Sequence, residues 1–86
     1  MAQLTQTSLY NSLRFLCQSF EANNQYAEAI LTYKRYLKMA QAKGNSEGEL
    51  FAKESLGRVY FNNKQFGLSN AFYQQLLVRG LVRVEF

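Results

Sequence analysis

The sequence predicts an all-α protein, built from two antiparallel helical hairpins that stack as a short solenoid of four helices. The 86-residue chain contains no proline, so long helices can form without interruption. Apolar residues make up 48% of the chain and charged residues 19%, a composition typical of a globular protein. One residue pattern occurs twice, 40 positions apart. A repeat of this period indicates a solenoid, in which each unit buries its apolar face against its neighbours.

The two copies share identical, aromatic and small residues in register. The identical positions are Leu16/Leu56, Asn23/Asn63, Gln25/Gln65, Tyr33/Tyr73 and Leu37/Leu77. Aromatic residues occupy Phe20/Tyr60 and Tyr26/Phe66, and small residues occupy Ser12/Ala52, Cys17/Gly57, Ala27/Gly67 and Ala29/Ser69. Small residues at matching places allow close contacts between stacked helices. We therefore expect a single domain over residues 1–86, with repeat one at about 10–43, repeat two at about 50–80 and a tail at 81–86.

Repeat one contains two predicted helices separated by an asparagine pair. The first should cover about Thr5 to Ala22 and the second about Gln25 to Ala42. Asn23-Asn24 ends one helix and starts the next, because asparagine tolerates the left-handed conformation and can also cap a helix. Spacings of three and four predict a buried stripe of Leu9, Leu13, Leu16, Cys17 and Phe20 on the first helix, and of Ala29, Ile30, Tyr33, Leu37 and Ala40 on the second.

Repeat two begins after Gly44, which suits the position following a helix end. Ser46 and Glu49 have capping-box spacing and predict the start of a third helix that runs to about Phe61. Asn62-Asn63 ends it, and a fourth helix follows from about Gln65 to Arg79, terminated by Gly80. The predicted buried stripes are Leu50, Lys53, Leu56, Gly57 and Tyr60 on the third helix, and Phe66, Ser69, Tyr73, Leu76 and Leu77 on the fourth.

The doubled motif resembles the tetratricopeptide repeat (TPR) family. The resemblance rests on Leu56-Gly57-x-x-Tyr60 followed by Phe66, Ser69 and Tyr73, with Leu16, Cys17, Phe20, Tyr26, Ala29, Tyr33 and Leu37 in copy one. It implies a right-handed solenoid. The 40-residue period exceeds the usual value of about 34 and is similar to the longer variant of Pins-type adaptor proteins. Lys53 replaces a bulky apolar residue, and Tyr36 and Leu76 replace alanine, so helix packing should be looser or differently angled.

The resemblance implies a non-catalytic protein-interaction module, an adaptor or scaffold that binds a peptide or helix on a concave wall lined by the first helix of each hairpin. The wall residues are Asn11, Arg14, Gln18 and Glu21 in copy one, and Phe51, Glu54, Arg58, Phe61 and Asn62 in copy two. Phe51 and Phe61 would hold apolar side chains, and Arg14 and Arg58 would pair with carboxylates. Alternatively, Phe51 packs against Asn11 and Arg14 of the neighbouring repeat, and Phe61 against the tail.

Catalysis is not expected, because the chain has no histidine, no glycine-rich phosphate loop and no metal-ligand cluster. We therefore expect no cofactor and no bound metal. The net charge of +4 favours an acidic partner. The alternative to protein binding is RNA binding by a helical repeat. It rests on Tyr10-Asn11-Ser12-Leu13, which is similar to the opening helix of a pentatricopeptide repeat. Copy two lacks this opening, so a protein or peptide partner is preferred over nucleic acid.

The carboxyl end is apolar and lies outside the repeat. Residues 81–86 alternate apolar and charged types, which leaves open fraying, continuation of the fourth helix, or a strand added to a partner sheet. Solenoids usually need about three repeats, so we expect either further repeats or a homo-oligomer formed through this end. A further interpretation is that the chain is a fragment or a designed repeat protein that self-associates. The apolar residues concerned are Leu76, Val78, Leu81, Val82 and Val84.

The sequence also predicts the compartment. No stretch reaches the roughly 18 apolar residues of a membrane span, and the amino terminus is too polar for the core of a signal peptide. The single cysteine, Cys17, cannot form an internal disulfide and is expected to be a small, buried, reduced thiol. A cytoplasmic location is therefore expected.

Overall fold

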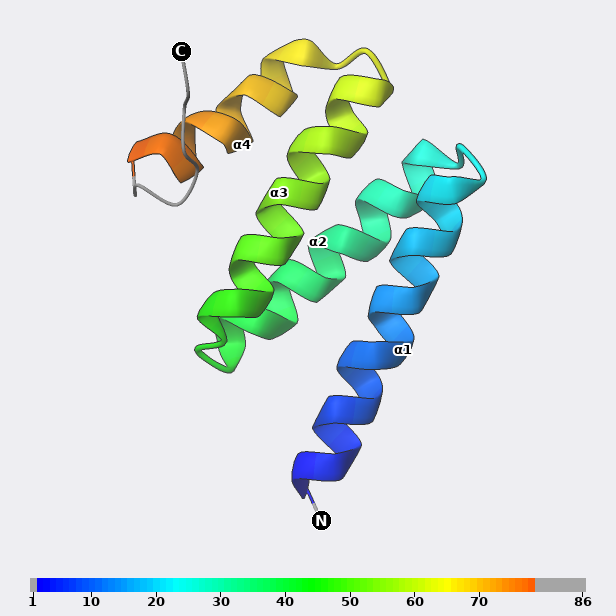
Figure 1. The fold of residues 1–86 in the computed structure, drawn as a ribbon, viewed down its shortest axis with the longest axis vertical. Helices are drawn as coiled ribbons and strands as arrows, with labels where there is room; N and C mark the ends of the chain where they lie inside the picture. Colours follow the sequence, from blue (N-terminus) through cyan, green and yellow to red (C-terminus); the bar gives the residue numbers. More distant parts are fainter. Residues whose placement is uncertain (1, 79–86) are drawn as a thin grey trace.

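The computed structural model describes residues 2–78, and the side chains of residues 8–77. This part of the chain is all-helical and contains no strand, as expected from the sequence. The four helices are α1 (Ala2–Ala22), α2 (Tyr26–Ala42), α3 (Ser46–Asn62) and α4 (Phe66–Val78). Each helix runs antiparallel to the one before and packs mainly on its neighbours in sequence (Figure 1). The expectations for Arg79, Gly80 and the tail at 81–86 fall outside the described residues.

All four predicted helix starts differ slightly from the structure: α2 and α4 begin one residue later than predicted, at Tyr26 and Phe66. Helix α1 begins at Ala2 rather than Thr5. Helix α3 is capped by Asn45, not Ser46, because the Asn45 side chain accepts a hydrogen bond from the Gly48 backbone N–H at 3.0 Å. Asparagine and serine both make good caps, so sequence spacing alone did not distinguish two adjacent candidates.

The three turns repeat one hydrogen-bonding pattern. The residues with positive φ are Asn24, Gly44 and Lys64, which are evenly spaced by 20 positions. After each of them, a backbone N–H reaches back to the last turn of the preceding helix: Gln25 to Phe20 at 2.9 Å, Asn45 to Ala40 at 2.8 Å and Gln65 to Tyr60 at 2.8 Å. This is the Schellman type of helix end. Helices α2 and α3 with the turns that follow them therefore occupy 20 residues each, and the 40-residue period corresponds to a pair of helices.

The buried core lies between the helices and combines residues from both repeats. Its centre contains Cys17, Ala29, Tyr33, Leu56, Val59 and Tyr60. Burial raises the pKa of the Cys17 thiol to about 12, so the sulfur is protonated and a poor nucleophile at neutral pH. Tyr36 and Leu76, where the sequence resemblance would place alanine, are both buried. Tyr36 packs edge-on against Tyr10 and Phe51, with ring centroids 5.3 and 5.0 Å apart.

Four residues assigned to buried stripes are instead exposed. They are Leu9 and Leu16 on α1, and Phe66 and Leu77 on α4, with 55%, 44%, 54% and 42% of their surfaces exposed. Helical spacing correctly placed them near the apolar stripe, but burial also requires a neighbouring helix on that side. Helices α1 and α4 are the first and last of the described helices, so each has only one described helix as its neighbour in sequence (Figure 1).

Lys53 is buried despite its charge. Its stem lies in the core position that the repeat pattern reserves for an apolar residue, and its side chain is 7% exposed. The Nζ atom pairs with Glu49 Oε1 at 3.1 Å, one helical turn earlier on α3. A long methylene stem with a charged end can fill an apolar place while keeping its ammonium group near a carboxylate and water.

Candidate protein-interaction surface

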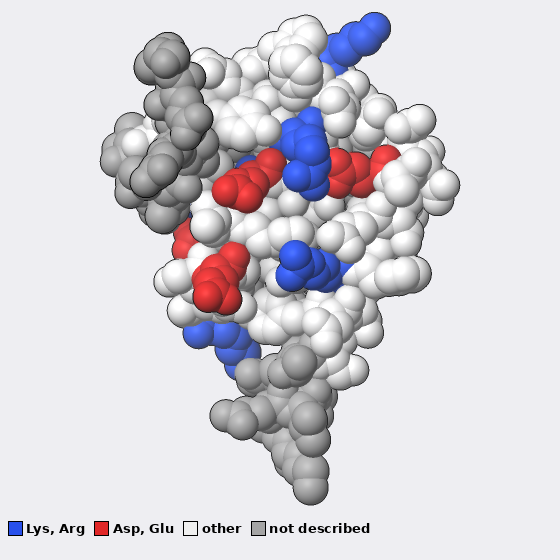
Figure 2. Space-filling model, viewed as in Figure 1, with Lys and Arg blue, Asp and Glu red and all other residues white. Residues whose placement is uncertain are grey.

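All of the residues predicted to bind a partner lie on α1 and α3. In Figure 1 these two helices run in the same direction, and α3 passes in front of α2. Figure 2 shows the same face, where acidic and basic side chains alternate within an otherwise uncharged surface. We call this face the α1/α3 wall and define it by the nine predicted residues: Asn11, Arg14, Gln18, Glu21, Phe51, Glu54, Arg58, Phe61 and Asn62.

Glu21 and Arg58 form an ion pair that joins α1 to α3 across the wall. Arg58 donates from Nε to Glu21 Oε2 at 2.5 Å and from Nη2 to Oε1 at 2.9 Å, a two-pronged geometry that favours arginine over lysine. The Tyr33 hydroxyl from α2 donates to the same Oε1 at 2.7 Å. One carboxylate therefore ties three helices together, and much of the hydrogen-bonding capacity of Arg58 is used within the molecule.

The pKa values of this cluster follow from these contacts. Hydrogen bonding to the Arg58 guanidinium lowers the pKa of Glu21 below its ordinary value of 4.5, although partial burial acts in the opposite direction. Burial, followed by the hydrogen bond to the Glu21 carboxylate, raises the pKa of Tyr33 to about 12. Glu21 therefore stays ionised and Tyr33 stays protonated across the physiological range, so the cluster acts as a permanent structural link.

The Glu21 link should stabilise the fold in a pH-dependent way. We expect Glu21→Gln to lower the free energy of unfolding near neutral pH by about 1 kcal/mol, because the amide loses the charge but keeps an oxygen for Tyr33. Arg58 is nearly half exposed, which limits the effect through screening. The folded pKa of Glu21 is depressed, so its contribution is complete above the unfolded pKa and is lost as the pH falls through the folded pKa.

Urea titrations of both proteins between about pH 3 and pH 7 should show the two stabilities converging on acidification. Glu54→Gln is the matched control, because Glu54 is an exposed carboxylate on the same wall. Its removal should change stability by less than about 0.5 kcal/mol. A stability difference for Glu21→Gln that stays constant over the whole pH range would contradict the ionic origin of the effect.

Phe51 belongs mostly to the packing between the repeats. Its ring lies edge-on to Tyr33 and Tyr36, with centroid separations of 5.8 and 5.0 Å. The Arg14 guanidinium sits over the ring, 4.2 Å from its centroid, in a cation–π contact. The second of the two sequence interpretations, in which Phe51 packs against the neighbouring repeat, therefore describes its contact with Arg14. Arg14 itself is exposed and remains accessible to a partner on the wall.

Phe61 is exposed at the far end of the wall from Phe51. Its side chain is 57% exposed and lies edge-on to Phe66, which begins α4, with ring centroids 5.2 Å apart. Its expected alternative partner, the tail, is outside the described residues. The remaining wall residues Asn11, Gln18, Glu54 and Asn62 are exposed, with Asn62 at the end of α3. The structure thus gathers Arg14, Glu21, Phe51 and Arg58 in one contact network and leaves Phe61 open beside Phe66.

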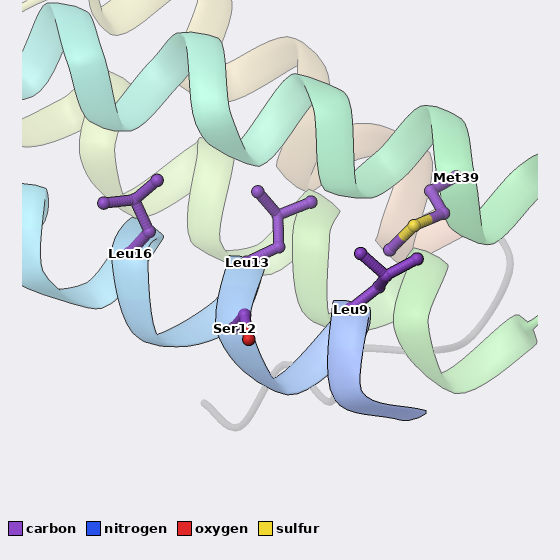
Figure 3. A pocket seen from close by; sticks show the side chains of 5 residues that line it. All are labelled: Leu9, Ser12, Leu13, Leu16 and Met39. Carbon is purple, nitrogen blue, oxygen red and sulfur yellow. The ribbon is translucent and has the colours of Figure 1, made fainter. Parts of the chain in front are cut away.

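An apolar groove between α1 and α2 was missed by sequence reasoning. Figure 3 shows three leucines of α1 pointing toward α2 and Met39 of α2 pointing back toward them. The groove has a volume of about 230 Å³ and is lined by Leu9, Ser12, Leu13, Leu16 and Met39. The leucines were assigned to a closed core. The sequence did contain one sign that this surface differs between the repeats. Leu9 and Leu13 are replaced by the charged residues Glu49 and Lys53 at the matching positions of repeat two.

Comparison with family models, curated proteins and solved structures gave no match to this chain. Among the described residues, histidine, cysteine and carboxylate side chains form no cluster of three or more that could hold a metal ion. None of the helices within the described part of the chain is both long and apolar enough to cross a membrane.

Proposed function

We propose that this protein is a non-catalytic protein-interaction module that binds a peptide or helix on the α1/α3 wall. In this proposal the two helix pairs stack as a short right-handed TPR-like solenoid. Two observations support the stacking: each helix packs mainly on its sequence neighbours, and the same helix-end geometry recurs every 20 residues. A solenoid presents equivalent helices on one face, which gives an extended surface suited to elongated ligands.

The exposed pair of Phe61 and Phe66 is the observation that carries the proposal. Both residues are more than half exposed, and their rings lie edge-on to each other across the α3–α4 turn. Aromatic side chains of this kind lose little conformational entropy on binding and are frequent energetic centres of protein interfaces. An apolar side chain of a partner placed against this pair would bury surface that the isolated molecule leaves in water.

The charges on the wall indicate the second feature of the partner. Arg58 is engaged by Glu21, so Arg14 is the cation better placed to receive a carboxylate. Arg14 lies over Phe51, ten residues before Phe61 on α3, and this separation corresponds to about 15 Å along a helix axis. A partner that uses both anchors therefore needs an acidic and an apolar residue about 15 Å apart, which is about five residues in an extended peptide.

The same charges disfavour RNA as the ligand. A nucleic-acid backbone requires a continuous basic surface, whereas acidic and basic side chains alternate on this face (Figure 2). The wall itself contains Glu21 and Glu54 as well as its two arginines. Arg58 is in addition paired within the molecule. The wall has no excess of positive charge to offer a row of phosphates, and a protein partner with mixed polarity fits it better.

Selection from a display library of random linear peptides, panned against the full chain, tests the proposal. We expect selected peptides to combine an aromatic or large aliphatic residue with an aspartate or glutamate at the stated spacing. Phe61→Ser should weaken a selected peptide by about tenfold or more, as expected for an aromatic anchor. Isothermal titration calorimetry with synthetic peptides provides the dissociation constants.

Leu31→Ser is the matched control, because Leu31 is an apolar residue of α2 with similar exposure and is not part of the wall. It should leave peptide affinity within about twofold. Recovery of no peptides, or of peptides that bind Phe61→Ser as well as the parent protein, would argue against the α1/α3 wall as the site. Binding of single-stranded RNA with higher affinity than any selected peptide would replace the proposal with the RNA alternative.

A further inference from the structure

The apolar groove between α1 and α2 lies on the side of α1 that faces away from the α1/α3 wall. Leu9, Leu13 and Leu16 recur at spacings of four and three residues, and they point toward α2, where Met39 points back toward them (Figure 3). On a helix with about 3.6 residues per turn, this stripe lies nearly opposite the residues that α1 contributes to the wall. A ligand in the groove and a ligand on the wall therefore contact different surfaces.

The shape and lining of the groove suit the apolar edge of another helix. The stripe from Leu9 to Leu16 extends for about 10 Å, or two helical turns. The groove has a volume of about 230 Å³, and no charged side chain lines it. Apolar residues at i, i+4 and i+7 of a docked helix repeat over the same length and enter such a groove as a ridge. A flat membrane surface fits less well, because the lining side chains point toward one another across a hollow (Figure 3).

Two cations border the groove on its α2 side. Arg35 lies one helical turn before Met39, and Lys38 follows Arg35 by three residues on the same side of α2. Both are exposed, and neither forms an ion pair within the described residues. The acidic residue of α2, Glu28, lies nearly two turns before Arg35, and α1 has no acidic residue over positions 2–20. One rim of the groove is therefore basic and the other is free of acidic side chains.

These charges determine which kind of helix fits the groove. An acidic residue along one edge of a docked helix meets the basic rim, whereas a basic residue there is repelled. Within residues 2–78, no helix of this chain combines several exposed large apolar side chains with an exposed acidic residue. The exposed apolar residues of α4 are accompanied by no charged residue at all. The described helices of a second copy therefore do not supply this combination, and the matching helix belongs to another protein.

We propose that the groove between α1 and α2 binds an acidic amphipathic helix of a partner protein. The apolar stripe of that helix contacts Leu9, Leu13 and Leu16, and its acidic edge faces Arg35 and Lys38. This site is separate from the α1/α3 wall and does not depend on ligand binding there. Because the two surfaces lie on opposite sides of α1, one molecule can hold a ligand on each and so connect two partners.

Fluorescence anisotropy with a labelled model helix and the full chain tests the proposal. The acidic probe is a peptide with leucines at i, i+4 and i+7, glutamates along one edge of that stripe, and alanine and glutamine elsewhere. The comparison peptide has lysine in place of every glutamate. We expect the acidic probe to bind at least about tenfold more tightly than the basic peptide. This preference should shrink as the salt concentration rises from about 0.05 to 0.5 M, because salt screens the exposed charges.

Three variants locate the binding. Leu16→Gln removes apolar surface at a partly exposed position and should weaken the acidic probe by about tenfold. Arg35→Glu makes the rim acidic at that point and should abolish or reverse the preference between the two peptides. Lys64→Glu is the matched control, because it makes the same change in net charge at an exposed residue of the α3–α4 turn. It should leave both affinities within about twofold. Circular dichroism melts verify that each variant is folded.

Several outcomes would overturn the proposal. One is the absence of binding of the acidic probe up to about 1 mM protein, and another is equal affinity for the two peptides. A third is binding that neither Leu16→Gln nor Arg35→Glu weakens. Sedimentation with phosphatidylserine vesicles addresses a membrane as the ligand: vesicle binding that Arg35→Glu abolishes, without binding of the probe, would assign the basic rim to a lipid surface. No wall ligand takes part in these measurements, so their failure is distinguishable from a failure of the α1/α3 wall to bind peptides.

Discussion

Replacing Leu56 with alanine is expected to lower the free energy of unfolding by about 3 kcal/mol, whereas the same replacement at Leu16 should cost less than about 1 kcal/mol. The two leucines occupy the same place in the two repeats, but Leu56 is fully buried in the core and Leu16 is 44% exposed. Removing the Leu56 side chain leaves a cavity between packed helices, and removing that of Leu16 widens a groove already open to solvent.

The expected effect is large for a chain of this size. A domain of this length has a total stability of about 4–13 kcal/mol, and a loss of about 3 kcal/mol should lower the melting temperature by roughly 12–24 °C. Thermal and urea denaturation followed by circular dichroism, at a concentration where both variants are monomeric, measure the difference. Equal losses at the two positions would show that Leu16 is covered in solution by something other than a neighbouring molecule.

Removing the negative charge of Glu49 should also destabilise the fold, by about 2 kcal/mol in Glu49→Gln. Lys53 Nζ pairs with the Glu49 carboxylate at 3.1 Å and its side chain is buried, so the substitution leaves an ammonium group with weaker compensation. Lys53→Met is expected to be neutral or stabilising, because an apolar side chain of similar length removes the need to compensate a buried charge. The two partners of one ion pair should thus respond in opposite ways.

Glu47→Gln is the control for this prediction. Glu47 and Glu49 both lie in the first turn of α3, where a carboxylate interacts favourably with the helix dipole. Glu47 is exposed, and its substitution should cost only about 0.5 kcal/mol. The amount by which Glu49→Gln lowers the free energy of unfolding more than Glu47→Gln therefore measures the cost of leaving the buried Lys53 without its carboxylate. The double variant Lys53→Met/Glu49→Gln should recover most of that stability difference. If it does not, the destabilisation by Glu49→Gln comes from an interaction of Glu49 other than its ion pair with Lys53.

The sequence by itself determined the local structure of this protein. The doubled residues predicted four helices, and the asparagine pairs and Gly44 marked the three turns between them. The left-handed residue is Asn24 in the first turn and Gly44 in the second, but Lys64, directly after the second asparagine pair, in the third. These features depend on backbone conformation and on contacts within about one helical turn, which are encoded by neighbouring residues. The pattern also identified the small and aromatic core positions Cys17, Ala29, Tyr33 and Tyr60, which are buried as expected.

Only the tertiary structure decided which equivalent residues are covered. Leu16 and Leu56 read alike in sequence, as do Leu37 and Leu77, but each pair divides into a more buried and a more exposed member. The links of Glu21 to Arg58 and Tyr33 join residues far apart in the chain, and no local spacing signals them. The physical reason is that burial and ion pairing depend on which helix lies alongside, and a repeated sequence places identical residues beside different neighbours.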